Sequence, residues 1–239
     1  MILFISDLHL CASRPETTAA FRRFLAGPAR EAQSLWILGD LFEFWVGDDA
    51  LSEPFHAEIA EALAELARSG VAIRILRGNR DFLLGKTFAR RAGASLVNEP
   101  ALIEAFGLRL VLTHGDAECT QDLAYQRFRR RIRSPLSRAI LLCLPLALRH
   151  ALAKRMRDRS EASHKASNAY DLDPKAVSVL FRATQADAMI HGHTHRPTCH
   201  RLELDGSTHE RWVLADWHDR PTWLELSEQG LKAKKEGKA

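Results

Sequence analysis

Imidazole, carboxylate and amide side chains recur along this chain in five short motifs, each placed directly after an apolar run. The motifs are Asp7-Leu8-His9, Gly39-Asp40, Gly78-Asn79-Arg80-Asp81, His114-Gly115-Asp116 and His191-Gly192-His193-Thr194-His195. Together they offer nitrogen and oxygen ligands and no thiolate, the set expected for two divalent ions that activate water against a phosphate ester. Because Asp-x-His or Gly-Asp alone is ordinary turn chemistry, the prediction rests on all five motifs in this order.

The apolar runs before the motifs predict the strands that position them. They are Ile2–Ile5, Leu35–Leu38, Val71–Leu76, Leu108–Leu112 and Ala188–Ile190, with later strands near Leu202–Leu204 and Trp212–Ala215. Apolar residues three or four apart predict helices that end near Gly27 and Gly70. This alternation predicts an α/β layered domain with its site in loops at the carboxyl ends of strands. On extended backbone, Asp7 and His9 are expected to share one face, and the last motif repeats this spacing.

With these motifs in this order, the chain resembles the calcineurin-like metallophosphoesterases over roughly residues 1 to 217. The resemblance implies a four-layered α/β/β/α metallophosphoesterase sandwich with a helical cap insertion. It also implies two metal ions that share the carboxylate of Asp40. Arg80 stands where the commoner family pattern has His, which argues against broad phosphatase activity. The implied ligands are Asp7, His9, Asp40 and His195 for one ion, and Asp40, Asn79, His114 and His193 for the other.

The flanks of the motifs are similar to a narrower family, the UDP-2,3-diacylglucosamine diphosphatases of lipid A biosynthesis. The similar stretches are Ser6–Leu10, Leu38–Asp49, Arg77–Lys86, His114–Asp116 with Cys119-Thr120, and Ile190–Pro197. This resemblance implies hydrolysis of the pyrophosphate bond of UDP-2,3-diacylglucosamine, giving 2,3-diacylglucosamine 1-phosphate (lipid X) and UMP. Water would attack the α-phosphorus, usually with Mn²⁺ as the metal, and the lipid-linked UDP-sugar would come from the cytoplasmic face of the inner membrane.

The same resemblance assigns roles to individual side chains. The implied catalytic residues are Asp40, Asn79, Arg80 and His114. The implied substrate contacts are Asn79, Arg80, Asp122, Ser160, His164, Lys165 and His193. The family has an Asn between the Ser and the Lys, and here either Ser163 or His164 stands in its place.

Length and composition fit one enzyme domain of 239 residues. We expect residues 1–239 to form a single domain, with a basic, apolar helical insertion at about residues 122–168 and a solvated C-terminal tail from about residue 228. Four cysteines without a C-x-x-C pair indicate free thiols in a reducing cytosol. Only five residues precede the first polar motif, so we expect no signal peptide. We expect a cytoplasmic monomer that associates peripherally with the inner membrane.

The insertion leaves three interpretations open. Residues 127–159 hold 11 Lys or Arg and one acid, Asp158, whereas the whole chain has a formal net charge of +4. The apolar stretch Ala139–Leu148 is too short to span a bilayer, which takes roughly 20 residues. The arginines either solvate the outer face of a packed helical hairpin or bind an anionic membrane surface. Nucleic acid is not expected as a partner, because Phe128 is the only aromatic residue among these arginines.

Two other functions compete with lipid-nucleotide hydrolysis. One is a different dinuclear-metal phosphoesterase that acts on nucleotides or phosphoproteins. The other is a non-catalytic scaffold that keeps the fold and binds a partner or a membrane. A scaffold has no need of a full ligand set, whereas all seven ligand positions here carry competent side chains. Metal content, together with manganese-dependent release of UMP, would discriminate among the three.

Overall fold

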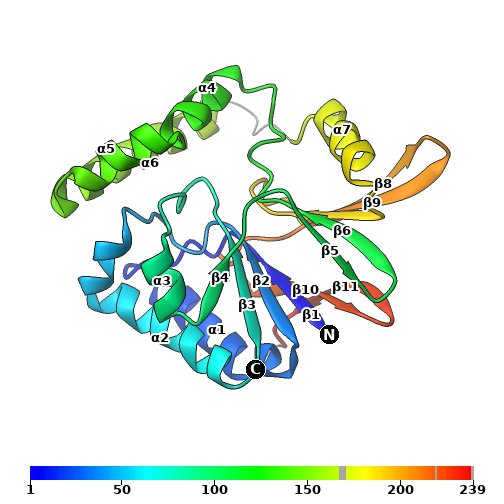
Figure 1. Cartoon of the computed structure of the whole chain (residues 1–239), viewed down its shortest axis with the longest axis horizontal. Helices are drawn as coiled ribbons and strands as arrows, with labels where there is room; N and C mark the ends of the chain where they lie inside the picture. Colours follow the sequence, from blue (N-terminus) through cyan, green and yellow to red (C-terminus); the bar gives the residue numbers. More distant parts are fainter. Residues whose placement is uncertain (167–170, 219, 238–239) are drawn as a thin grey trace.

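Two β-sheets packed face to face, with helices on both outer faces, form the body of the protein (Figure 1). The structure is a computed structural model that describes residues 1–166, 171–218 and 220–237, with backbone only for residues 158–166. The strands are β1 (Ile2–Ile5), β2 (Ser34–Leu38), β3 (Ala72–Leu76), β4 (Ala94–Leu96), β5 (Ala101–Ala105), β6 (Leu108–Leu112), β7 (Ala188–His191), β8 (Thr198–Leu204), β9 (Ser207–Val213), β10 (Thr222–Ser227) and β11 (Gly230–Lys235). The α-helices are α1 (Pro15–Ala26), α2 (Pro54–Arg68), α3 (Lys86–Arg91), α4 (Leu123–Ile132), α5 (Pro135–Cys143), α6 (Leu146–Ala166) and α7 (Pro174–Thr184).

The motif-bearing strands lie next to one another inside each sheet. The first sheet has the order β11-β10-β1-β2-β3-β4, and β1 to β4 run parallel. The second has the order β5-β6-β7-β9-β8, in which β6, β7 and β9 run parallel. Since parallel strands end at the same edge of a sheet, the loops after β1, β2 and β3 are neighbours, as are those after β6 and β7. The five strands predicted before the motifs are therefore confirmed.

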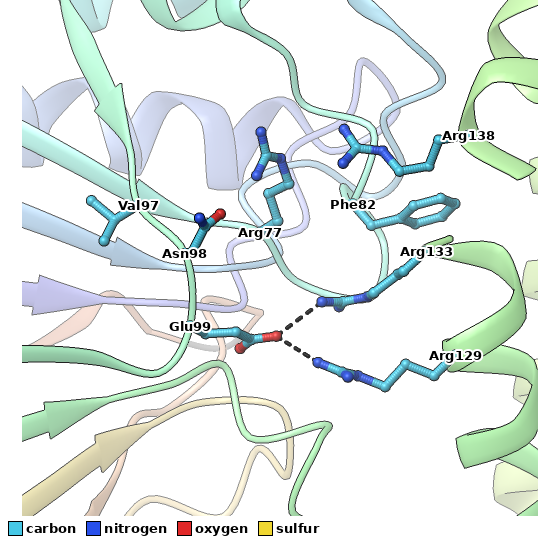
Figure 2. Close-up of a pocket in the computed structure, with 8 residues that line it drawn as sticks. All are labelled: Arg77, Phe82, Val97, Asn98, Glu99, Arg129, Arg133 and Arg138. Atoms are coloured by element: carbon cyan, nitrogen blue, oxygen red, sulfur yellow. Dashed lines mark hydrogen bonds and ion pairs between the residues drawn. The ribbon is translucent and has the colours of Figure 1, made fainter. Parts of the chain in front are cut away.

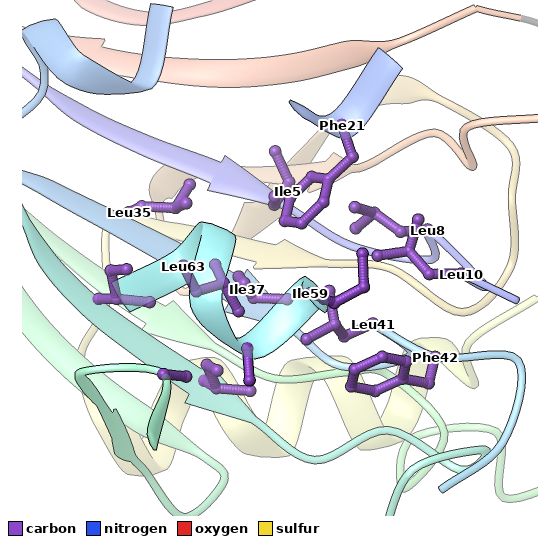
Figure 3. Packing of buried hydrophobic residues seen from close by; sticks show 14 of the residues in the cluster. Ile5, Leu8, Leu10, Phe21, Leu35, Ile37, Leu41, Phe42, Ile59 and Leu63 are labelled. Carbon is purple, nitrogen blue, oxygen red and sulfur yellow. The ribbon is translucent and has the colours of Figure 1, made fainter. Parts of the chain in front are cut away.

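Alternate residues of the motif-bearing strands enter different apolar layers. In β1, Leu3 and Ile5 pack under the helices on the outer face, in a cluster where Figure 3 shows Ile5, while Phe4 packs between the two sheets. In β7, Ile190 faces the space between the sheets and Met189 faces α7. Strands covered on both faces read as continuous apolar runs, which is why the sequence identified them. The helix, sheet, sheet and helix layers confirm the four-layered sandwich.

Helices α4, α5 and α6 stand apart from these layers and form a cap (Figure 1). Ion pairs help to hold the cap: no residue of α5 is fully buried, although Leu141 packs against the core under the helices. The Arg149 side chain is only 4% exposed; its guanidinium bonds the Asp49 carboxylate, at 2.9 Å for one pair of atoms, and the carbonyl of Val46. His150 contacts Glu53 at 2.6 Å. No helix in the described part of the chain is both long and apolar enough to cross a membrane.

Some arginines of the insertion do not solvate its outer face. That interpretation is wrong for Arg129, Arg133 and Arg149. Arg129 and Arg133 each form ion pairs with both Glu99 and Asp116. Arg149 is buried against the body in the same way. Arg129 and Arg133 point inward because the loops that they meet carry the largely buried carboxylates of Glu99 and Asp116. Arg127 and Arg130 are exposed, as the interpretation expected.

The prediction of a solvated tail from about residue 228 is also wrong. Residues Gly230–Lys235 form β11, which pairs antiparallel with β10 along its whole length. Gly230 has φ of 82°, so the chain reverses in a tight turn after Ser227. The lysines of β11 are exposed, and this polar pattern concealed the strand in the sequence. Exposed lysines on an edge strand also discourage pairing with other chains.

Arg149→Ala tests how the cap is held. The substitution should lower the free energy of cap opening by about 1–3 kcal/mol, because hydrogen bonds to a charged guanidinium are lost. Hydrogen exchange should accelerate in α5 and the first turns of α6 and stay unchanged in β1, β2 and β3. Arg130→Ala, on the exposed face of α4, is the matched control. Unchanged exchange in the Arg149 variant would mean that other contacts hold the cap.

Candidate metal centre

Loops from both sheets are bonded to each other where the ligand motifs lie. In the first sheet, the His9 amide donates to the carbonyl of Asp40 at 3.0 Å. In the second, the Gly192 amide donates to the carbonyl of His114 at 3.0 Å. The His193 amide joins the two sheets by donating to the Asp7 carboxylate at 2.9 Å. This network brings all seven predicted ligands to one edge of the sandwich.

Left-handed backbone turns, and not extended strand geometry, aim the ligand side chains. The φ angles are 54° at Asp7, 49° at His9, 52° at Asp40, 69° at His193 and 53° at His195. Non-glycine residues with such angles cost of order 1–3 kcal/mol each, and they cluster at functional sites. The expectation of a shared face on extended backbone is therefore wrong, although Asp7 and His9 still meet. His193 and His195 instead turn toward different partners.

Two glycines allow the loops to approach the ligands closely. A Cβ on Gly78 would lie 2.0 Å from Asp40 Oδ1, and one on Gly192 would lie 2.1 Å from Asp7 Oδ2. No side chain fits at such distances, because the neighbouring atoms belong to buried groups. The glycines thus serve the packing of the candidate ligands themselves.

The first group of ligand atoms comes from Asp7, His9 and His195. His195 Nε2 lies 3.3 Å from Asp7 Oδ1 and 3.4 Å from His9 Nε2. On its other side, His195 Nδ1 contacts Asp216 Oδ2 at 3.1 Å. Burial lowers the pKa of His195, but its contacts with Asp216 and Asp7 raise it to about 10. With Nδ1–H directed at Asp216, the ring aims Nε2 at the ligand group, as in carboxylate–histidine–metal arrangements.

The second group lies around the amide oxygen of Asn79. Asn79 Oδ1 is 2.8 Å from His114 Nε2 and 3.0 Å from His193 Nδ1. His114 directs its other nitrogen to the carbonyl of Leu38 at 2.9 Å, which orients the ring. Burial lowers the pKa of His193 to about 3, so this ring is a neutral electron donor at physiological pH.

Asp7 and Asp40 connect the two groups. Asp40 Oδ2 lies 3.7 Å from His114 Nε2 and 4.0 Å from His9 Nε2. Asp7 belongs to both sets of mutually close donor atoms, one with His9 and His195 and the other with Asp40 and His114. Burial raises the pKa of Asp40 to about 7, whereas contact with His195 outweighs burial and lowers the pKa of Asp7. Asp40 thus lies between the groups, and Asp7 shares that central place.

The donor set fits divalent cations. Among the described residues, no group forms a hydrogen bond with the buried atoms Asp7 Oδ1 and His9 Nδ1, which is costly unless another group satisfies them. Carboxylate, amide and imidazole donors without thiolate suit ions such as Mn²⁺ or Mg²⁺ better than soft metals. The residues present therefore fit a pair of divalent ions.

The predicted substrate contacts fall into three classes. Arg80 lies beside the ligands, since its amide donates to Asp40 Oδ1 at 2.8 Å and its guanidinium is 3.6 Å from Glu43. Asp122 accepts from the Tyr125 amide at 2.9 Å and so caps α4. The side chains of Ser160, His164 and Lys165 lie outside the described residues.

Acidic residues around the ligands were missed by the sequence reasoning. Asp216 follows β9, so the rule that polar residues after strands form the site could have found it. Glu43 is 4% exposed and contacts Arg14 at 3.0 Å, Arg80 at 3.6 Å and Arg157 at 3.3 Å. No sequence signal separates Glu43 from an ordinary surface acid, because its three partners are distant along the chain.

Comparison with known proteins agrees with this geometry. The family model of the calcineurin-like phosphoesterases matches residues 1–197. The chain belongs to this family. The matched region contains all seven candidate ligands, and it ends before Asp216, which contacts His195.

Close relatives within the calcineurin-like phosphoesterases share nearly the whole chain. A UDP-2,3-diacylglucosamine hydrolase of Aeromonas hydrophila is 50% identical over 224 residues, which cover 93% of this chain and 92% of the relative. Proteins of the same name from Pseudomonas fluorescens strain Pf0-1 and Ralstonia nicotianae are 46% and 47% identical. Each alignment covers 97% of this chain, with 94% and 91% of the respective relative.

Asp216→Ala tests the support of His195. Losing a carboxylate that orients a metal-binding imidazole typically weakens metal affinity by about 10–100-fold. We expect that loss when chelator-treated protein is titrated with Mn²⁺. Asp205→Ala removes an exposed acid in the turn between β8 and β9, which pairs with Arg182 of α7, and should leave the affinity unchanged. Equal affinities for the two variants would show that Asp216 does not support the centre.

Proposed function

We propose that this protein hydrolyses the pyrophosphate bond of UDP-2,3-diacylglucosamine to give lipid X and UMP, a step of lipid A biosynthesis. The observation that carries the proposal is the 50% identity, over more than nine-tenths of both chains, to a relative named for hydrolysis of this compound. The convergence of seven nitrogen and oxygen donors supports it, because a non-catalytic scaffold needs no such set.

The proposed ligands follow the two groups in the structure. Asp7, His9, Asp40 and His195 would hold one ion, and Asp40, Asn79, His114 and His193 the other, with Mn²⁺ as the proposed metal. When bound, such a pair lowers the pKa of water and neutralises charge on phosphoryl oxygens. Asp216 and the carbonyl of Leu38 orient two of the rings, so the donors are in place before substrate arrives.

Arg80 is the proposed clamp for the diphosphate. Its guanidinium is one-fifth exposed, close to the ligands and held on one side by the Glu43 carboxylate. In the proposed reaction, water attacks the α-phosphorus and the bond to the bridging oxygen breaks. A guanidinium that donates two parallel hydrogen bonds stabilises the charge that develops on the phosphate oxygens.

The cap is the proposed receiver of the acyl chains and the contact with the cytoplasmic face of the inner membrane. Apolar side chains of α5 and early α6 are exposed, including Leu136 at 71% and Ile140 at 57%. Leu142 and Leu148 are each nearly half exposed. Apolar side chains beside arginines suit both acyl chains and an anionic lipid surface.

Metal-dependent release of UMP from UDP-2,3-diacylglucosamine is the direct test of the proposal. Purified protein should release UMP with Mn²⁺ and stop after chelation. Asp40→Ala should lose bound Mn²⁺ and at least about a hundredfold in rate, because a central buried carboxylate is removed. Asp205→Ala should behave as wild type. Metal-replete wild-type protein that releases no UMP would overturn the proposal.

Arg80→Lys tests the clamp. Lysine keeps the positive charge but offers no planar pair of donors, so UMP release should fall roughly tenfold or more while metal content stays normal. Arg91→Lys, on the exposed end of α3, is the matched control. A normal rate in the Arg80 variant would exclude bidentate clamping by this residue.

A further inference from the structure

A cavity of about 280 Å³ lies beside the metal centre, lined by the end of β3 and by cap helices α4 and α5. Arg77 comes from the body, and Arg129, Arg133 and Arg138 come from the cap (Figure 2). Glu99 faces Arg129 and Arg133 across the cavity in the same view. Four guanidinium groups around so small a space require several negative charges nearby.

The structure supplies those charges for two of the four arginines. Glu99 Oε1 accepts from Arg129 at 2.6 Å and from Arg133 at 2.9 Å. Asp116 accepts from the same two side chains at 2.8 and 3.0 Å. The second oxygen of Glu99 accepts from the His114 amide at 3.0 Å. Two cations and two carboxylates thus balance each other, and Glu99 has no oxygen left for the other arginines.

Arg77 and Arg138 are the cations without such compensation. Arg77 Nε donates to the carbonyl of Leu84 at 2.7 Å, and among the described residues its two terminal nitrogens have no partner. The Arg138 side chain likewise has no hydrogen bond or ion pair within the described part of the chain. Burial, followed by repulsion from Arg138 and Arg133, lowers the pKa of Arg77. Both guanidinium groups therefore present free donors and unbalanced charge to the cavity.

The carboxylates near Arg77 and Arg138 already accept hydrogen bonds from backbone amides. The two oxygens of Asp81 accept from the amides of Gly78 and Leu41 at 2.7 and 2.8 Å. Asp48 accepts from the amides of Gly85 and Thr87, at the start of α3. These carboxylates reduce the local positive potential, but they form no ion pair with Arg77 or Arg138 within the described residues.

We propose that this cavity binds a small oxyanion of the phosphate class between Arg77 on the body and Arg138 on the cap. Guanidinium groups match phosphate oxygens through paired hydrogen bonds. The volume lies below the usual range of about 300–1,000 Å³ for small-molecule sites, so a phosphate group fits and an acylated sugar does not. A bound anion would join the cap to the loop that carries Asn79 and Arg80.

The phosphate group has two sources, free inorganic phosphate or a nucleoside monophosphate such as UMP. The test measures the thermal unfolding midpoint of the metal-loaded protein during titration with inorganic phosphate, at constant ionic strength maintained with chloride. Wild-type protein and Arg130→Gln should show a saturable rise. Arg138→Gln should need roughly tenfold more phosphate or more, because charge-assisted hydrogen bonds are lost. Phosphate bound at the metal centre contributes equally to all three proteins, so the difference reports on the cavity.

A second variant and two further ligands identify the source of the phosphate group and control for misfolding. Arg77→Gln should repeat the loss, and unchanged metal content should show that both variants keep the centre intact. Titration with UMP and with uridine separates the sources. An Arg138-dependent response to UMP at lower concentration than phosphate assigns the nucleotide, and an equal or weaker one assigns free phosphate. Identical phosphate responses in wild type, Arg130→Gln and Arg138→Gln would overturn the proposal, as would a response to uridine that matches UMP.

Discussion

The rest of the structure depends on two carboxylates, Asp7 and Asp40, which are buried at the edge shared by both sheets. Asp7 and Asp40 are at most 2% exposed, and no lysine or arginine among the described residues forms an ion pair with them. Burying charge without compensation is costly, and the pKa of Asp40 accordingly rises to about 7. Contact with His195 offsets the burial of Asp7 and lowers its pKa, whereas the pKa of Asp40 stays raised. The arrangement therefore favours positive charge supplied from outside the chain.

The packed strands of both sheets and the buried carboxylate of Asp81 hold the candidate ligands in their strained backbone conformations. Five ligand residues have left-handed backbone, which costs free energy that the packed strands beneath them must offset. Asp81 helps because it is fully buried and accepts from the amides of Leu41 and Gly78, thereby joining the loops after β2 and β3. The ligand positions thus follow from the sheets and from these bonds together.

The sequence predicted the strands and singled out the candidate ligands because both have local signatures. The run Leu35–Leu38 is buried on both faces, so it reads as unbroken apolar sequence that ends at Gly39. β11 escaped prediction because an edge strand needs no apolar pattern when its hydrogen bonds come from β10. The left-handed angle at Asp7 was not predicted either, because its hydrogen-bond partners Gly39 and His193 are distant in the sequence.

The basic insertion and the ligand motifs are separate features in the sequence. In the structure, the inward-pointing arginines of the cap connect them. Arg133 donates to the carbonyl of Gly78 at 2.8 Å and pairs with Asp116, two residues beyond His114. Arg157 reaches Glu43, the acid that also contacts Arg80. The basic charge of the insertion thus neutralises acids that hold the ligand loops in place. Because the pairs Arg133–Asp116 and Arg157–Glu43 also join the cap to the body, they couple the docking of the cap to the electrostatics of the candidate metal centre.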